Sequence, residues 1–192
     1  MMMTAGPASA SRASRASPSA AVADLDTPIG GMIAAATQTH LVLLEFGRRR
    51  TLDRQLERAA RATGLRFERG DSPILEQLRR ELAEYFRGAR RAFDVPLHAP
   101  GTPFQMRVWA ELQRIAAGTT ATYGRVAAAI GHPTAVRAVA HANGDNRIAI
   151  LIPCHRVIGA DGSLTGYGGG LWRKKKLLDL EAQADAPRLP GL

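Results

Sequence analysis

The single cysteine of this 192-residue chain, Cys154, is the residue whose neighbours most clearly suggest chemistry. It follows the apolar run 148–153 and is followed directly by His155 and Arg156. A thiolate is the reactive form of cysteine, and nearby cationic groups lower the pKa of a thiol. A lone buried cysteine is more commonly an inert, small apolar residue. The segment by itself therefore leaves two interpretations open, a nucleophile and a core residue.

The elements around Cys154 must decide between these interpretations. The run 148–153 predicts a buried strand that ends at the cysteine. Adjacent residues of a strand point to opposite faces, so His155 can assist Cys154 only if the chain bends there. Downstream, six glycines between positions 159 and 170 predict a flexible loop, and Tyr167 lies within it.

A helix is predicted after this loop, over 172–182, and the basic run 173–176 opens it. Cations at a helix N-terminus oppose the helix dipole. The run therefore indicates either a phosphate partner that favours it or simply a solvated face.

Three further helices are predicted upstream of the cysteine, over 104–115, 123–130 and 135–142. The tight turn 131–134 gives the last two the pattern of a helix-turn-helix, although many helical hairpins share that spacing. Alanines leave the surface of the third helix nearly bare around Arg137. Such a helix can approach DNA closely and insert one side chain into the duplex. The alternative is a small-residue face that packs on the core beside a solvated arginine.

The first half of the chain has the pattern of a small scaffold without a site of its own. Two apolar runs at 32–36 and 41–46 predict a β-hairpin. Ser72 followed by Pro73 predicts the start of an amphipathic helix over 73–87. The other elements expected in this half are a helix and a short strand, at 51–63 and 65–67.

Composition divides the chain into parts. Residues 1–23 are rich in Ala and Ser and contain no acid, which predicts a disordered tail, with a transit peptide as the alternative. Three prolines and a glycine within 96–103 predict a linker. The fold class is predicted to be α/β (α+β). The expected parts are a tail (1–23), an N-terminal α/β domain (24–95), the linker (96–103), a mainly helical C-terminal domain (104–183) and a second tail (184–192).

The charge favours a polyanionic partner. Lys and Arg total 26 against 17 Asp and Glu, which gives a net charge of +9, and lysine occurs only at 174–176. Arginine pairs with phosphate through a planar fork, although a general bias toward arginine explains the composition equally well. No apolar run reaches the roughly 18–20 residues of a membrane helix. One cysteine excludes an internal disulfide and a cysteine-based zinc finger.

The segment 152–157, Ile-Pro-Cys-His-Arg-Val, resembles the active-site signature of the O6-alkylguanine-DNA alkyltransferases, also called methylated-DNA–protein-cysteine methyltransferases. Further segments resemble the motifs of that family in the family's order, so that the resemblance covers about residues 24–183. These segments are 26–30, 84–88, 93–97, 101–105 with Val108 and Trp109, 119–124, 137–139 and 162–167. Ordered motifs around one cysteine are highly specific, and they favour the nucleophile over the core residue.

The resemblance implies roles for five residues near the chemistry. Cys154 would take the alkyl group from guanine O6 irreversibly. His155 would act on it through a bound water, and Glu181 would orient His155, which is the nucleophile–base–orienter logic of a triad. Tyr123 would donate a proton or hydrogen bond to guanine N3, and Asn146 would tie the third helix to the cysteine segment. An ordinary interhelical aromatic residue and a turn residue are the alternatives for Tyr123 and Asn146.

The resemblance also implies a DNA-binding face and a lesion pocket. Arg137 would fill the gap that the flipped base leaves. The expected DNA-binding residues are Arg137, Ala135, Ala138, Thr119 and Tyr123, and the expected pocket residues are Tyr167, Gly168, Val157 and Lys174.

The implied function is stoichiometric, suicidal repair of O6-alkylguanine in double-stranded DNA, with methylated-DNA–protein-cysteine S-methyltransferase activity and O4-alkylthymine as a further expected substrate. The expected protein is a cytoplasmic, bacterial-type monomer with no cofactor, no metal and no membrane partner. The alternatives are a non-catalytic lesion sensor, a transcription factor that uses the helix-turn-helix, and a cysteine hydrolase.

Some positions depart from the family pattern. Arg147 follows Asn146 where proline is common, which either alters the turn or adds a phosphate contact. Asp145 places an acid near the expected DNA face and lowers the expected affinity, and Ala116-Ala117 replaces a common proline-containing turn. The N-terminal unit has His40 but no cysteine, so no zinc is expected there.

Overall fold

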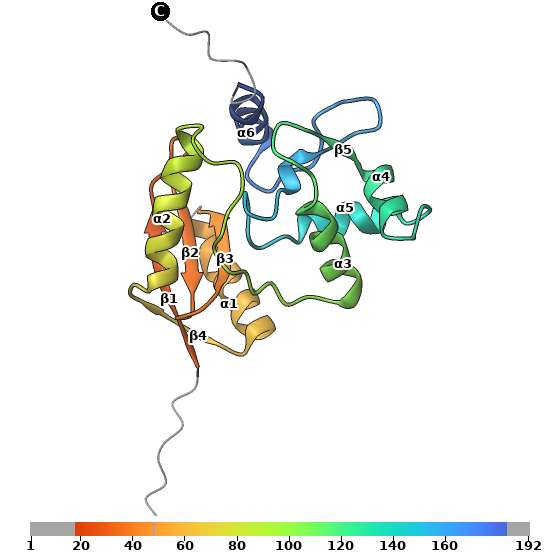
Figure 1. Ribbon diagram of the computed structural model, residues 1–192. Coiled ribbons are helices and arrows are strands. Elements are labelled where there is room, and N and C mark those ends of the chain that lie inside the picture. The colour runs from red at the N-terminus through yellow and green to blue at the C-terminus, as the bar shows by residue number, and fades with distance from the viewer. Residues whose placement is uncertain (1–17, 48, 184–192) are drawn as a thin grey trace, which may run out of the picture.

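The computed structural model describes residues 18–47 and 49–183, and it has two units that lie side by side (Figure 1). The first unit is a sheet with two helices, and the second is mainly helical. The α/β class and the two-part layout expected from the sequence are confirmed. Residues 1–17 of the tail expected at 1–23, and the whole tail expected at 184–192, lie outside the described residues.

The N-terminal boundary is corrected by the structure. Strand β1 spans Ser19–Leu25 and pairs with two neighbours in the sheet, so residues 19–23 are not part of a disordered tail. Their buried positions alternate, with Ala20 1% and Val22 4% exposed. The alanine-rich composition obscured this alternation, because alanine carries little β signal of its own.

The sheet has the order β3-β2-β1-β4. The hairpin predicted at 32–36 and 41–46 is confirmed as β2 (Met32–Ala36) and β3 (Leu41–Phe46), which pair antiparallel. Every residue of β2 is buried, because its two faces belong to two different apolar clusters. Ile33 and Ala35 pack toward α1 (Arg49–Thr63), whereas Met32, Ala34 and Ala36 pack toward α2 (Pro73–Phe86).

Helix α2 begins where the sequence predicts. The Ser72 hydroxyl accepts a hydrogen bond from Leu75 N at 3.2 Å, and Pro73 occupies the first turn, where its missing N–H costs nothing. The short strand expected at 65–67 is found as β4, Arg66–Arg69, parallel to β1. The segment 96–103, predicted as a linker, runs beside the start of β3. Leu41 N donates to Pro96 O, and His98 N donates to Leu41 O, both at 2.8 Å.

The C-terminal unit contains the predicted helix-turn-helix. Helix α3 (Pro103–Leu112) begins at a capping box of Thr102 and Gln105. Helices α4 (Tyr123–Ala129) and α5 (Val136–Gly144) follow, and α5 packs against both α3 and α4. The remaining elements are the paired strands β5 (Ala121–Thr122) and β6 (Val157–Ile158), and helix α6 (Leu171–Gln183).

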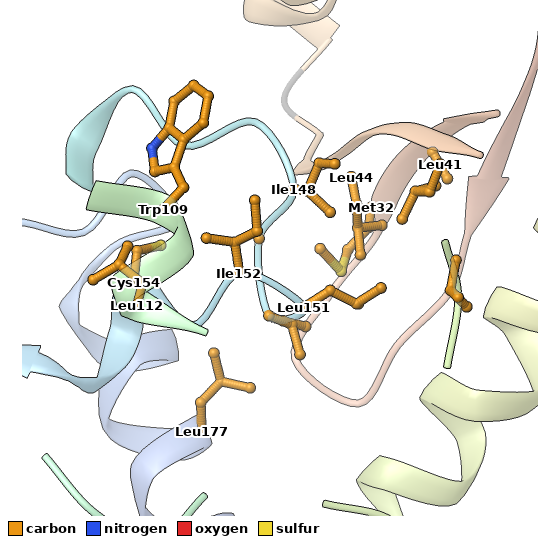
Figure 2. Close-up of a cluster of buried hydrophobic side chains, with 14 of the residues drawn as sticks. Met32, Leu41, Leu44, Trp109, Leu112, Ile148, Leu151, Ile152, Cys154 and Leu177 are labelled. Atoms are coloured by element: carbon orange, nitrogen blue, oxygen red, sulfur yellow. The ribbon is translucent and has the colours of Figure 1, made fainter. Parts of the chain in front are cut away.

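The prediction of a strand over 148–153 is wrong. The segment is a buried, irregular stretch with one bridge between Ile148 and Leu44, and Ile150 has a positive φ of 72°. An apolar run of this length is buried on all sides whatever its backbone does, so periodicity does not distinguish its conformation. Figure 2 shows Ile148 beside Leu44 of the sheet, and Ile152 beside Trp109 of α3. The segment therefore joins the two units into one core.

No helix within the described parts of the chain is both long and apolar enough to cross a bilayer.

Candidate active site

Cys154 begins a short 3-10 helix, Cys154–Arg156, directly after the irregular segment. Its side chain is buried, with 6% of the residue exposed, and it lines a pocket. Asn146 Nδ2 donates to Cys154 Sγ at 3.1 Å and to Ile152 O at 2.8 Å, and Asn146 Oδ1 accepts from Ile148 N at 3.0 Å. One amide thus holds both the cysteine segment and the sulfur.

Burial raises the pKa of the Cys154 thiol, and the Asn146 hydrogen bond and the Lys174 charge offset this only in part. The sequence predicts the opposite direction, because His155 and Arg156 are neighbours in the chain. Both side chains bind Glu181, so their proximity in sequence to Cys154 does not lower the pKa of the thiol. The resting group is a thiol, and the site needs a base to activate it.

The chain at Cys154 is a 3-10 helix rather than a strand, and His155 on this helix contacts Glu181. His155 is fully buried, and its Nε2 lies 2.9 Å from Glu181 Oε1 on α6. Glu181 also accepts two hydrogen bonds from Arg156. The Nε of Arg156 is 3.0 Å from Oε2, and its Nη2 is 2.8 Å from Oε1. The expected pair of His155 and Glu181 is therefore brought together, and Arg156 joins it in bidentate geometry.

Sequence reasoning did not predict the contacts that two residues, Tyr85 and Arg156, make in this cluster. Tyr85 OH, from α2 of the first unit, donates to Glu181 Oε1 at 2.7 Å. Arg156 also donates to Ile115 O, which anchors its guanidinium to the turn after α3. The signal for Arg156 lay in the motif 152–157 itself. Tyr85 belongs to the segment 84–88 that resembles a family motif, but its partner lies 96 positions away in the chain.

The charges of this cluster follow from its hydrogen bonds. Burial by itself would raise the pKa of Glu181, but the hydrogen bonds from His155 and Arg156 outweigh it and hold that pKa well below its usual range. Burial lowers the pKa of His155 despite the nearby carboxylate. A neutral His155 that donates from Nε2 to Glu181 leaves Nδ1 as the acceptor, and Nδ1 is buried without a partner among the described residues. The cluster therefore presents a neutral, oriented base.

The pocket at Cys154 has a volume of about 150 Å³ and is walled by three parts of the chain. They are the end of β3 and a residue of α1 from the first unit, the end of α5 with the segment after it, and the loop before α6. The lining residues are Glu45, Phe46, Arg58, Asn143, Gly144, Asp145, Asn146, Arg147, Ala149, Cys154, Gly166, Tyr167, Gly168 and Gly169.

Two of the four expected pocket residues, Tyr167 and Gly168, line this pocket, whereas Val157 and Lys174 do not. Val157 is fully buried, and its carbonyl accepts from Lys174 Nζ. Lys174 Nζ also donates to Thr165 O at 2.6 Å, so this lysine holds the start of the loop that lines the pocket. The run 173–176 is thus not a solvated face throughout: Lys174 is fully buried, and Lys175 pairs with Asp179 at 2.8 Å.

None of the five expected DNA-binding residues lines the Cys154 pocket, and three of them are exposed. Arg137 and Ala138 are exposed on α5, and Ala135 stands at its N-cap. Thr119 is exposed, and its hydroxyl donates to Ala116 O. Tyr123 begins α4 and is half-buried, with its OH 3.5 Å from Thr165 O of the pocket loop. Tyr123 is therefore the residue that connects the exposed helices with the pocket.

The two departures near the pocket are engaged by other residues. Asp145 Oδ1 lies 3.2 Å from Arg58 Nη2, and its Oδ2 accepts from Gln105 Nε2 at 2.9 Å. Asp145 is thus held by Arg58 of α1 and Gln105 of α3. Arg147 Nη1 donates to Pro100 O at 3.0 Å.

Both units of the chain match families of known proteins. Residues 23–99 match the 6-O-methylguanine DNA methyltransferase ribonuclease-like domain, and residues 103–183 match the 6-O-methylguanine DNA methyltransferase DNA binding domain. The constitutive methylated-DNA–protein-cysteine methyltransferase of Bacillus subtilis is 39% identical over 153 residues, which cover 80% of this chain and 89% of the relative. The Mycobacterium tuberculosis H37Rv protein of the same name is 57% identical over 101 residues, which cover 53% of this chain and 61% of that relative.

Solved structures match over more of the chain. The crystal structure of Mycobacterium tuberculosis O6-methylguanine methyltransferase is 40% identical, covers 88% of this chain and 96% of its own, and has a TM-score of 0.72. The structure of Mycobacterium tuberculosis OGT in complex with DNA is 41% identical, covers 85% of this chain and 93% of its own, and has a TM-score of 0.70.

Proposed function

The chain belongs to the 6-O-methylguanine DNA methyltransferase family, and we propose that it repairs O6-alkylguanine in double-stranded DNA by moving the alkyl group to its own Cys154. The observation that carries this proposal is the juxtaposition at one pocket. A cysteine sulfur held by Asn146 opens onto it, and the next residue is a base oriented by Glu181. The proposed parts are the sheet unit from Ser19 to 95, the linker 96–103 and the unit 104–183 that carries the chemistry.

The proposed transfer needs no cofactor, because the chain and the damaged base together account for every proton and bond. The Cys154 proton passes to His155 Nδ1 through one water molecule, and Glu181 stabilises the resulting imidazolium. The thiolate attacks the alkyl carbon, so that the S–C bond forms as the C–O6 bond breaks. The guanine leaves with the electron pair, and Tyr123 donates a proton or a hydrogen bond to its N3. The product is a thioether, which water does not hydrolyse, so each molecule reacts once.

The exposed helices supply access to the base. Chemistry on a stacked base requires its extrusion, which costs a few kcal/mol. In the proposal Ala135 and Ala138 let α5 approach the minor groove, Arg137 replaces the extruded base, and Thr119 and Tyr123 contact the adjacent backbone. Binding of this kind depends on phosphate contacts, so it is largely independent of sequence and weakens with salt. The protein acts as a monomer in the cytoplasm.

The test is the intact mass of the protein after incubation with a duplex that contains O6-methylguanine. We expect one added methyl group, located on Cys154, and none on the Cys154→Ala variant. An unmodified protein would indicate a lesion sensor or a transcription factor, and a return to the starting mass would indicate a hydrolase. The same measurement with O4-methylthymine tests the second substrate.

A further inference from the structure

The wall of the Cys154 pocket that precedes α6 is held from the other unit of the molecule. This wall is the loop Gly166–Gly169, and the last residue of β3, Phe46, lies against it. The Phe46 and Tyr167 rings meet edge to face with centroids 6.1 Å apart. A Cβ at Gly169 would lie 2.6 Å from Phe46 Cδ2 and 2.9 Å from Tyr167 Cε1, so the strand and the loop are already in close contact.

Arg173 at the start of α6 fastens this contact. Its Nη1 donates to Gly169 O of the pocket loop at 2.7 Å, and its Nε donates to Ile29 O of the first unit at 2.7 Å. The guanidinium carbon lies 4.8 Å from the centre of the Phe46 ring and 4.3 Å from that of Trp172. One planar group thus bridges the two units by hydrogen bonds and by stacking, a combination that lysine does not reproduce.

The two ends of the loop are held differently. Lys174, the next residue on α6, binds Thr165 O before the loop and Val157 O, and both carbonyls belong to the C-terminal unit. The other end of the loop, at Gly169, contacts Arg173 and Phe46. Phe46 belongs to the first unit, and Arg173 is bound to Ile29 O of that unit. The position of Gly166–Gly169 relative to Cys154 therefore depends on where the N-terminal unit sits.

We propose that the N-terminal unit sets the size of alkyl group that the pocket accepts, because Arg173 and Phe46 fix the Gly166–Gly169 wall opposite Cys154. This inference rests on the proposed function and assigns to Arg173 a positioning role and to the first unit a part in substrate selection. A small pocket with a fixed wall favours methyl over benzyl adducts. Without these contacts the loop moves away from Cys154. The pocket then admits a benzyl group and positions a methyl group less well.

The test compares rates of transfer from O6-methylguanine and O6-benzylguanine placed in the same duplex. In Arg173→Ala and in Phe46→Leu we expect the ratio of the benzyl rate to the methyl rate to rise by about tenfold, the scale on which hydrophobic pockets discriminate by size. Arg173→Lys keeps the charge but loses the fork and the stacking, so it should resemble Arg173→Ala. Lys175→Ala, on the same helix and away from the loop, is the matched control and should leave the ratio unchanged.

Two further measurements separate selection from simple loss of folding. The double variant Arg173→Ala/Phe46→Leu should change the ratio no more than either single variant, because both release the same wall. Gly169→Ala leaves Arg173 in place but forces the loop off Phe46, and it should change the ratio as well. General instability lowers both rates together and leaves their ratio constant.

The outcomes also separate this inference from the proposed function. If the wild-type protein gains the methyl group on Cys154 while all these variants keep the wild-type ratio, the inference is overturned and the proposed function stands. If the wild-type protein gains no alkyl group, the proposed function fails first.

Discussion

The two regions that the proposed repair needs, the cluster around Glu181 and the exposed face of α5, are built in opposite ways. Tyr85, His155, Arg156 and Glu181 are all less than 7% exposed, and each has a partner within the cluster. On α5, Arg137 is exposed beside alanines. A buried charge is stable only beside a partner that compensates it, whereas an exposed face carries little of the folding energy. Chemistry and folding should therefore be coupled at the first region and separable at the second.

The largest expected effect is that of Glu181→Gln, which leaves the buried Arg156 without its countercharge. Breaking a buried ion pair by removing one partner typically costs about 3–5 kcal/mol of unfolding free energy. We expect a loss of that size in urea unfolding, accompanied by loss of alkyl transfer, because His155 also loses its orientation. Asp179→Asn on the same helix removes the carboxylate of an exposed pair with Lys175 and should cost less than about 1 kcal/mol. Equal losses in the two variants would contradict the contrast between the regions.

Glu45 tests whether the mouth of the pocket behaves like the buried cluster. Burial raises the pKa of Glu45 to about 7 from 4.5, although the positive charges of Arg58 and Arg147 oppose this; Cys154 and Asp145 are further titratable groups that line the same pocket. Because the folded protein prefers the protonated carboxyl, its contribution to stability is full below pH 4.5 and is lost as the pH rises through 7.

The difference in unfolding free energy between the wild type and Glu45→Gln should therefore shift by at most about 3 kcal/mol against the wild type over this pH interval. Urea unfolding at several pH values measures it. Glu57→Gln, on the exposed side of α1, is the control. A pH-independent difference for Glu45→Gln would mean that the carboxyl has the same pKa in the folded and unfolded chains.

A pair of identical substitutions compares the two regions directly. Tyr85→Phe removes a buried hydroxyl that donates to the Glu181 carboxylate at 2.7 Å, and hydrogen bonds to charged groups contribute about 1.5–3 kcal/mol. Tyr123→Phe removes a half-exposed hydroxyl whose contact with Thr165 O is 3.5 Å long, and it should cost less than about 0.5 kcal/mol. The order reverses for chemistry, because only Tyr123 is proposed to contact guanine. Single-turnover rates at a pH where both variants are folded should fall further for Tyr123→Phe, and the opposite order would contradict its proposed role.

The contrast between the regions also explains what could be predicted from the sequence. The hairpin at 32–46 and the capped helix from Pro73 were found because their signals are local: alternation, a cap and a proline. The helix-turn-helix was found for the same reason. The family resemblance supplied Cys154, His155 and Glu181, and the structure places the last two in contact.

Residues that act through tertiary contacts could not be predicted in this way. The contact of Tyr85 with Glu181 exists only because α2 lies against α6. Lys174 was expected at the pocket, but its burial and its hydrogen bonds to two carbonyls could not be predicted from the sequence. The segment 148–153 is apolar enough for a strand, but the core between the units imposes an irregular path on it. Such features depend on the packing of the two units, on which local patterns carry no information.

The smallest expected effect on stability, and the sharpest separation from chemistry, is that of Arg137→Ala. Arg137 is exposed on α5, so its loss should change the unfolding free energy by no more than about 0.5 kcal/mol. If its side chain replaces the extruded base, repair of O6-methylguanine in a duplex should slow by about tenfold or more, because the arginine offsets part of an extrusion cost of a few kcal/mol. Reaction with the free base O6-benzylguanine needs no extrusion and should keep its wild-type rate. Slower reaction with both substrates would assign Arg137 to the chemical step instead of base extrusion. The exposed face of α5 would then take part in the chemistry, as the Glu181 cluster does.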